Sequence, residues 1–226
     1  MSDKTIEDPL SITPILPKDA VIVIGRQFGS GGRTVGKKIA ALLGMDYYDT
    51  EVFDKAAKRI GLHPEIFKEH DEKKPSPLRA LMQGAFGIAD NFHAVPLNGE
   101  MIYEEQSRVI RELSKKGPCV IVGRTADCIL SDNPHLLSVF LHSPLACRAK
   151  QIIKRGEAAT EEEAYEKALR HDKKREAYYN FYCGEKRWGE ASNYHLSIDT
   201  SILDMDSIAE IIVKSYKSMI DNLEHQ

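Results

Sequence analysis

The residues with the clearest chemical potential form a glycine-rich stretch near the start of the chain. In order, they are Gly29, Ser30, Gly31, Gly32, Arg33 and Thr34. Glycines let consecutive backbone N–H groups turn into one concavity, and such a concavity binds anions, above all phosphates. We therefore expect these six residues to contact a polyphosphate. An ordinary glycine-rich turn of an α/β protein is the alternative interpretation.

The stretch departs from the standard phosphate-loop signature G-x-x-x-x-G-K-[ST], because the lysine is missing. Depending on the alignment, Arg33 or Gly32 stands in the place of the lysine. Arg33 is then the nearest cation, and its guanidinium would meet the phosphates as a planar fork rather than as a point charge. The hydroxyl of Thr34, or that of Ser30, is a candidate ligand for Mg²⁺.

The elements on either side of this stretch are those that a phosphate loop requires. A β-branched apolar run over residues 20–24 predicts a strand. Apolar residues at helical spacing predict a helix over residues 32–43, ended by Gly44. The start of a helix adds unpaired N–H donors and a partial positive charge, which both favour an anionic ligand.

Strands and helices alternate along the rest of the chain. Further strands are predicted at residues 45–48, 119–122, 136–141 and 194–198, and helices at residues 51–60, 100–116, 144–155, 160–179 and 206–221. This alternation predicts a mainly parallel five-stranded sheet with helices on both faces. Polar residues that follow the strands should meet at the carboxyl edge, where such sheets bind ligands. The candidates beside the glycine-rich stretch are Asp49, Thr50, Arg124 and Asp127.

The composition excludes several classes of protein. The chain has 226 residues, 42% of them apolar and 29% charged, with a net charge of −3. The negative charge argues against binding of nucleic acid polymers. No apolar run approaches the roughly 18 residues of a membrane span, and no signal-peptide pattern opens the chain. The four cysteines lack metal-site spacing, so we expect free thiols in a cytoplasmic protein.

The chain divides into a tail and one domain. We expect an N-terminal tail over residues 1–18 and a single domain over residues 19–226, with a helical insertion or acceptor-binding region at residues 62–98. Residues 148–187 carry 11 Lys/Arg against 8 Asp/Glu, a net of +3, which suits an anionic ligand but would also describe a solvated helix. The insertion and the long helix after it are candidates for a homodimer contact, but the sequence does not determine the oligomeric state.

Several motifs, in their order, resemble those of bacterial cytidylate kinases. They are residues 120–130 (Val-Ile-Val-Gly-Arg-Thr-Ala-Asp-Cys-Ile-Leu), 137–144 (Leu-Ser-Val-Phe-Leu-His-Ser-Pro), 147–150 (Cys-Arg-Ala-Lys), Asp172-x-x-Arg175, 194–203 (Tyr-His-Leu-Ser-Ile-Asp-Thr-Ser-Ile-Leu), and Tyr48-Asp49-Thr50 followed by Lys55. With its glycine-rich stretch, the chain is closer still to the cytidylate kinase-like family. The resemblance covers about residues 20–220.

This resemblance implies a P-loop kinase with a three-layer α/β/α fold, a mainly parallel five-stranded sheet and a helical lid or acceptor insertion, the lid lying within residues 148–190. It implies ATP- and Mg²⁺-dependent phosphoryl transfer to a nucleoside monophosphate, foremost CMP or dCMP. The implied catalytic residues are Arg33, Arg148, Arg170, Arg175 and Asp172. The implied acceptor residues are Asp49, Thr50, Lys55, Arg124 and Asp127, and Thr34 is the implied metal ligand.

Alternatives stay open. Thr125 stands where the family has an aspartate that touches the acceptor. The chain could therefore act on another small phosphorylated or hydroxyl acceptor, bind nucleotide as a silent sensor, or be an unrelated interaction protein. Arg148 and Arg170 could be exposed helix cations, and Asp49 or Asp127 could cap local structure. The tyrosines at residues 178, 179 and 182 and Trp188 could stack on a base or pack a lid.

Overall fold

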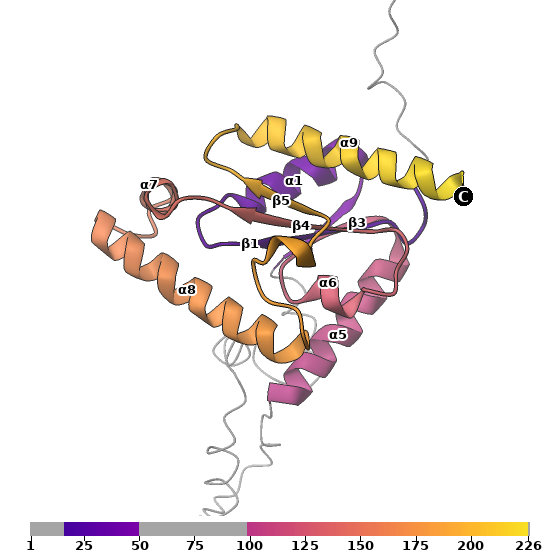
Figure 1. Cartoon of the computed structure of the whole chain (residues 1–226), viewed down its shortest axis with the longest axis horizontal. Helices are drawn as coiled ribbons and strands as arrows, with labels where there is room; N and C mark the ends of the chain where they lie inside the picture. The colour runs from indigo at the N-terminus through magenta and orange to yellow at the C-terminus, as the bar shows by residue number, and fades with distance from the viewer. Residues whose placement is uncertain (1–15, 50–98, 226) are drawn as a thin grey trace, which may run out of the picture.

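A single five-stranded parallel sheet organises the molecule (Figure 1). The computed structural model describes residues 16–49 and 99–225. The strand order is β2-β3-β1-β4-β5, and every neighbouring pair is parallel. The strands are β1 (Val21–Arg26), β2 (Asp46–Tyr48), β3 (Cys119–Val122), β4 (Leu136–His142) and β5 (Leu196–Asp199). The predicted sheet is therefore confirmed.

Helices cover both faces of this sheet (Figure 1). On one face lie α1 (Gly32–Leu43) and α9 (Met205–Glu224), and on the other lie α5 (Gly99–Lys116) and the short α6 (Ala126–Ile129). Beyond β4 the chain forms α7 (Leu145–Lys154) and α8 (Glu161–Tyr182), which pack against each other beside the glycine-rich loop. A short 3-10 helix, η1 (Ala191–Asn193), precedes β5. The three-layer arrangement is thus present.

The alternation of side chains along β1 explains the two cores. Ile22 and Ile24 belong to the cluster under α1 and α9, whereas Val21 and Val23 belong to the cluster under α5 and α6. Successive residues of a strand point to opposite faces, so a strand that is covered on both sides must be apolar throughout. Burial of this sheet by two helical layers is the main stabilising contribution to the fold.

β1 is longer than the sequence predicts, and this matters for the site. The predicted strand ends at Ile24, but the observed strand continues through Gly25 and Arg26. These two residues pair with Phe140 and Leu141 of β4, so the ladder extends past the end of the apolar run. The strand therefore carries a charged side chain at its carboxyl end.

Helix ends agree with the predicted signals in most places. The Thr160 hydroxyl accepts a hydrogen bond from the Glu163 N–H and so caps the start of α8, the helix predicted from residue 160. Gly44 ends α1 in the left-handed conformation. The helix predicted from residue 144 begins one residue later, because Pro144 is the N-cap of α7, and the Ser143 carbonyl accepts from the Arg148 guanidinium.

The prediction that all four cysteines are free thiols is wrong for two of them. Cys128 and Cys183, which are 55 positions apart, form a disulfide, whereas Cys119 and Cys147 are free. The bond joins α6 to the residue that ends α8. The spacing of the cysteines in the sequence does not reveal that α6 and the end of α8 lie next to each other.

Within the described ranges, no helix is long and apolar enough to cross a membrane. The predicted tail up to residue 15, the helix at 51–60 and the insertion at 62–98 lie outside the described residues.

Candidate active site

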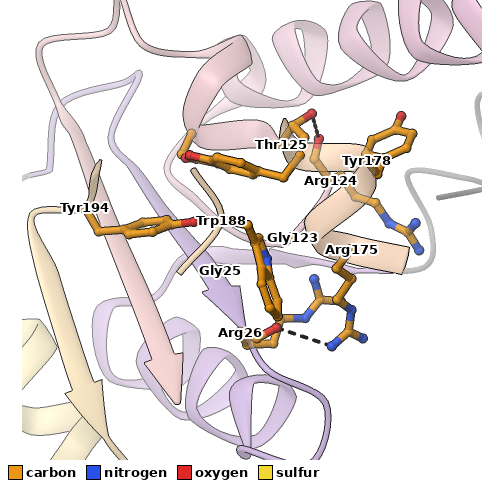
Figure 2. Close-up of a pocket in the computed structure, with 11 residues that line it drawn as sticks. Gly25, Arg26, Gly123, Arg124, Thr125, Arg175, Tyr178, Trp188 and Tyr194 are labelled. Atoms are coloured by element: carbon orange, nitrogen blue, oxygen red, sulfur yellow. Dashed lines mark hydrogen bonds between the residues drawn. The ribbon is translucent and has the colours of Figure 1, made fainter. Parts of the chain in front are cut away.

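Polar and aromatic side chains converge at the carboxyl ends of β1 and β3, under the C-terminal half of α8 (Figure 2). They enclose a cavity of about 30 Å³, enough for water but not for a nucleotide. The lining residues are Gly25, Arg26, Gly123, Arg124, Thr125, Asp127, Arg175, Tyr178, Tyr179, Trp188 and Tyr194. Three arginines therefore face one small, largely aromatic space. Of these residues, α8 contributes Arg175, Tyr178 and Tyr179.

The glycine-rich loop adjoins the cavity and has the backbone of an anion cradle. Gly29 and Gly31 both have φ of 87°, a left-handed conformation that L side chains rarely adopt. A Cβ atom on Gly29 would lie 3.0 Å from the Cβ and carbonyl O of Arg148, and one on Gly31 would lie 2.6 Å from Cε of Met205. Gly31 is the N-cap of α1, so the loop leads directly into the positive end of a helix. The loop thus fits a bound phosphate.

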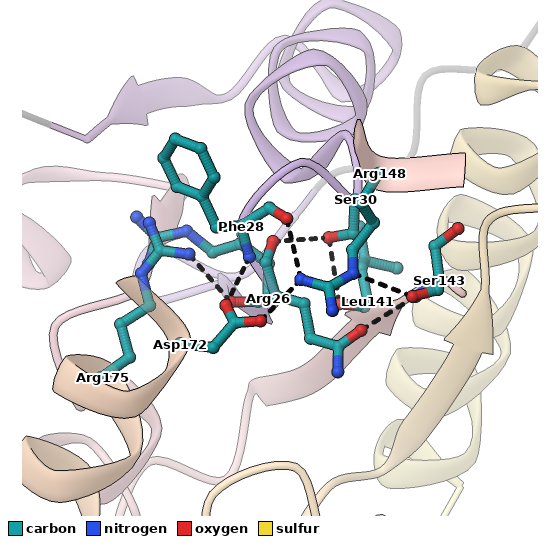
Figure 3. A network of polar contacts seen from close by, with 9 residues as sticks. Arg26, Phe28, Ser30, Leu141, Ser143, Arg148, Asp172 and Arg175 are labelled. Carbon is teal, nitrogen blue, oxygen red and sulfur yellow. Dashed lines mark hydrogen bonds and ion pairs between the residues drawn. The ribbon is translucent and has the colours of Figure 1, made fainter. Parts of the chain in front are cut away.

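The loop is held from beneath by polar contacts (Figure 3). The buried Ser30 hydroxyl lies 2.9 Å from the Gln27 carbonyl O and 3.1 Å from the Leu141 carbonyl O. The Gln27 side-chain oxygen accepts from the Ser143 N–H at 3.0 Å. Because the Ser30 hydroxyl is buried and hydrogen-bonded to these backbone carbonyls, Thr34 is the better of the two candidate metal ligands.

Arg148 and Asp172 form a buried ion pair, and both side chains hydrogen-bond to the backbone of the glycine-rich loop (Figure 3). Arg148 Nη1 donates to Asp172 Oδ2 at 2.6 Å and to the Phe28 carbonyl O at 3.1 Å. The Phe28 N–H donates to Asp172 Oδ1 at 2.7 Å. The alternative of an exposed helix cation is wrong for Arg148, whose side chain is only 5% exposed. These two side chains position the loop backbone from α7 and α8.

The ring of Phe28 extends the same attachment to α8. It stacks on His171 with 4.3 Å between centroids and 8° between planes. The Arg175 guanidinium lies 5.5 Å from the ring centroid, within range of a cation–π interaction. Burial raises the pKa of the Asp172 carboxyl, while the Phe28 N–H and Arg148 oppose that shift. The loop and α8 are thus one connected unit.

Asp49 follows β2 and lies between two arginines. Its Oδ2 is 2.6 Å from Arg33 Nε, and its Oδ1 is 3.8 Å from Arg26 Nη2. Oδ1 is buried and accepts no hydrogen bond from the described residues. Arg33 is 61% exposed at the start of α1. Sequence reasoning missed Arg26; the available signal was an arginine two positions after the predicted strand end, beside a phosphate loop without its lysine.

The turn after β3 has a rare backbone conformation. Gly123, Arg124 and Thr125 all have positive φ, at 79°, 68° and 54°. Non-glycine residues in this region cost about 1–3 kcal/mol each and cluster at functional sites. The turn brings Arg124 to the cavity and starts α6, so the next residues also face the site.

Asp127 is buried beside the aromatic residues of the cavity. Its Oδ2 accepts a hydrogen bond from the Tyr179 hydroxyl at 2.6 Å. Burial raises the pKa of the Asp127 carboxyl, and burial next to this carboxyl also raises the pKa of Tyr179. Tyr182 instead stacks on Tyr103 of α5 at 3.9 Å and packs the end of α8. Some of these aromatic residues therefore line the cavity, whereas Tyr182 packs the helix.

The remaining candidates are dispersed. Arg175 lines the cavity and donates from Nη1 to the Arg26 carbonyl O at 3.3 Å. Arg170 is exposed on α8 and does not line the cavity. Thr34 is exposed in the first turn of α1. Thr50 and Lys55 lie outside the described residues.

Comparison with solved structures agrees with this architecture. An uncharacterized protein from Eubacterium ventriosum superposes with a TM-score of 0.66 at 29% identity, covering 88% of this chain and 99% of that one. The shikimate kinase from Acinetobacter baumannii, solved with shikimate, superposes with a TM-score of 0.52 at 18% identity, covering 93% and 98%. The fold is therefore that of the P-loop kinases.

Comparison of sequences identifies the family. The cytidylate kinase from Pyrococcus horikoshii is 28% identical over 211 residues, covering 92% of this chain and 93% of that protein. The cytidylate kinase from Pyrococcus furiosus is 29% identical over 212 residues, with the same coverage. The family model described as "Cytidylate kinase-like family" matches residues 21–202. The chain therefore belongs to the cytidylate kinase-like family.

Proposed function

We propose that this protein transfers the γ-phosphoryl group of ATP to a nucleoside monophosphate, foremost CMP or dCMP. One observation carries the proposal: Arg26, Arg124 and Arg175 converge on one cavity next to a phosphate-binding loop. Donor and acceptor phosphates are both anionic, and a kinase must bring cations between them. The cytidylate kinases among the relatives support the choice of acceptor.

The reaction needs little proton chemistry with such an acceptor. An oxygen of the acceptor phosphate attacks the γ-phosphorus, a new P–O bond forms, and the bond from the γ-phosphorus to the β–γ bridging oxygen breaks. ADP leaves with that electron pair, and the acceptor becomes a diphosphate. The attacking oxygen is already deprotonated at neutral pH, so catalysis consists of positioning and charge neutralisation.

We assign the residues the following roles in this reaction. Residues 29–34 would hold the phosphates of ATP, with Arg33 on the exposed side. Arg124 and Lys55 would bind the acceptor phosphate, with Asp49 and Thr50 beside it. Arg175 reaches the cavity from α8, whereas Arg148 and Asp172 hold the loop. Arg170 would serve as a lid cation if α8 moves.

The acceptor base would bind between the aromatic side chains of the cavity. Tyr178, Tyr179, Trp188 and Tyr194 offer flat apolar surfaces, and Asp127 offers a hydrogen-bond acceptor. An exocyclic amine, as cytosine has, would match that acceptor. Because the present cavity is small, α8 must move outward to admit the base.

Two oxygen groups near the start of α1 fit Mg²⁺. They are the exposed Thr34 hydroxyl and the buried Asp49 Oδ1, which has no hydrogen-bond partner among the described residues. Hard oxygen donors are the ligands that Mg²⁺ prefers. When bound, the ion would neutralise charge on the phosphates of ATP.

The same Asp49 oxygen supports a second candidate, a kinase with a hydroxyl acceptor. An alcohol must lose a proton as it attacks the γ-phosphorus, and a buried carboxylate beside the loop could accept it. The two candidates differ in the role of this residue. Asp49→Asn should abolish turnover of an alcohol but leave a monophosphate acceptor with part of its activity.

The testing experiment is phosphoryl transfer from ATP with Mg²⁺ to CMP, dCMP, UMP, AMP and GMP. Formation of ADP and of the nucleoside diphosphate should be followed together by ion-exchange chromatography. We expect equal amounts of both products with CMP or dCMP. Tight ATP binding in calorimetry with no diphosphate from any of the five would refute the proposal and favour a hydroxyl acceptor or a silent sensor.

A further inference from the structure

The side chain that lies over the start of α1 belongs to Arg26, not to the helix itself. A Cβ atom on Gly32, the first residue of α1, would lie 2.8 Å from Cγ and 3.0 Å from Cβ of Arg26. The Cβ atom of Arg26 is fixed to the backbone of β1, and its Cγ atom can move away only if the whole side chain changes rotamer. Position 32 is therefore a glycine because the Arg26 side chain occupies the space above it.

A second glycine makes room for the other end of the same side chain. A Cβ atom on Gly123, at the end of β3, would lie 1.7 Å from Arg26 Nη1. No side chain can stand at position 123 while the guanidinium is in place. Two glycines from distant parts of the chain thus accommodate one arginine, which runs from the loop to the cavity (Figure 2).

The electrostatic surroundings of Arg26 favour an anion. Its side chain is 8% exposed, and the cavity that it lines also contains Arg124 and Arg175. Three like charges in one small space repel each other, and the carboxylates nearby include Asp49, Asp127 and, close to Arg175, Asp172. A phosphoryl group in transfer carries the charge that would relieve this repulsion.

We propose that Arg26 is the cation that contacts the phosphoryl group in transfer, the part played by lysine in the standard phosphate loop. The inference rests on the proposed phosphoryl transfer. The lysine of the signature projects from the start of the helix. In this chain an arginine reaches the same region from the end of β1, and a guanidinium can contact two phosphate oxygens at once. Arg33, bound to Asp49, is then a flanking residue.

The test exchanges one cation for the other. Arg26→Gln and Arg26→Lys should keep the fold, because both retain the stem. Arg26→Gln should lower kcat by about 100-fold or more and raise the KM for ATP about tenfold, because the guanidinium would contact the γ-phosphoryl group both before and during its transfer. Arg26→Lys should recover part of kcat. Gly32→Lys alone should be inactive or unstable, because its Cβ meets Arg26. Arg26→Ala/Gly32→Lys removes the Cγ atom that would lie 2.8 Å away and leaves the Cβ contact at 3.0 Å, which a small shift can relieve. Its kcat should be at least tenfold that of Arg26→Ala.

A matched control is Arg187→Gln, because the Arg187 side chain is exposed and donates, among the described residues, to carbonyl oxygens of Gly184 and Lys186 in its own loop. It should leave kcat unchanged. A folded Arg26→Gln with kcat within threefold of the unaltered protein would overturn the inference. So would a double variant that folds but is no faster than Arg26→Ala.

A binding measurement separates failure of this inference from failure of the proposed function. If the unaltered chain makes no diphosphate, Arg26→Gln should still bind ATP at least tenfold more weakly by calorimetry, with AMP affinity changed less than twofold. Equal ATP affinity in both proteins would overturn the role of Arg26 whatever the acceptor proves to be.

Discussion

Removal of the Asp172 carboxylate should destabilise the fold and loosen the phosphate loop together. In Asp172→Ala, Arg148 keeps its bonds to the Ser143 and Phe28 carbonyl oxygens but loses its only described carboxylate partner. Breaking a buried ion pair by removing one partner costs about 3–5 kcal/mol. The retained carbonyl bonds favour the lower end of this range, about 3 kcal/mol, which corresponds to a fall in Tm of roughly 6–12 °C for a chain of this size.

The same change should weaken ATP binding, because the Phe28 N–H then has no acceptor and the loop loses its attachment to α8. A net loss of about 1.4 kcal/mol in the positioning of the loop would raise the KM for ATP about tenfold. Urea unfolding would measure stability, and initial rates at varied ATP would measure KM. Glu176→Gln, an exposed change on the same helix, is the control and should alter neither.

A double variant separates the two effects. Arg148→Met/Asp172→Leu replaces the ion pair with apolar side chains, which often recovers the stability of a buried pair. It cannot restore the two bonds to Phe28, so the KM for ATP should stay high. The reasoning would be refuted if the double variant bound ATP normally, or if Asp172→Ala lost less than about 1 kcal/mol of unfolding free energy.

Three further predictions follow from other contacts. Arg124→Ala should raise the KM for the monophosphate about 10- to 100-fold and spare ATP, as initial rates at varied acceptor would show. Cys183→Ser breaks the bond to Cys128 and should lower the free energy of unfolding by about 4 kcal/mol, the chain-entropy value for a loop of 55 residues. Burial raises the pKa of Asp127, so its contribution to stability falls as pH rises. In Asp127→Asn the amide oxygen still accepts from Tyr179. The stability of this variant relative to the unaltered protein should therefore increase as pH rises above the unfolded-state pKa of about 4, which urea unfolding at several pH values would measure.

Each of these has its own contradicting outcome. Equal loss of ATP and monophosphate binding in Arg124→Ala would remove that residue from the acceptor side. A serine at the free Cys147 is the control for the disulfide, and equal stability of the two serine variants would show that the bond does not contribute. A difference between Asp127→Asn and the unaltered protein that is constant with pH would mean that the carboxyl does not titrate in this range.

Local patterns in the sequence determined the elements and their class. The apolar run before the glycines, the helical spacing after them and the capping motif at Thr160 all depend on neighbours within a few positions, and each corresponds to an element of the structure. Alternation of strands and helices then predicts a parallel sheet whose carboxyl edge carries the polar residues. That edge is where Arg124, Asp127 and Arg175 line one cavity.

Only the tertiary structure decided what these side chains contact. The partners of Arg148 lie on two loops and on α8, the cysteines of the disulfide are 55 positions apart, and the place of Arg26 depends on glycines at positions 32 and 123. Pairing of this kind is set by how helices pack on a sheet, which no local pattern encodes. A sequence indicates that the lysine is missing from a phosphate-loop motif, whereas only the packing of the sheet edge brings Arg26 next to the start of α1.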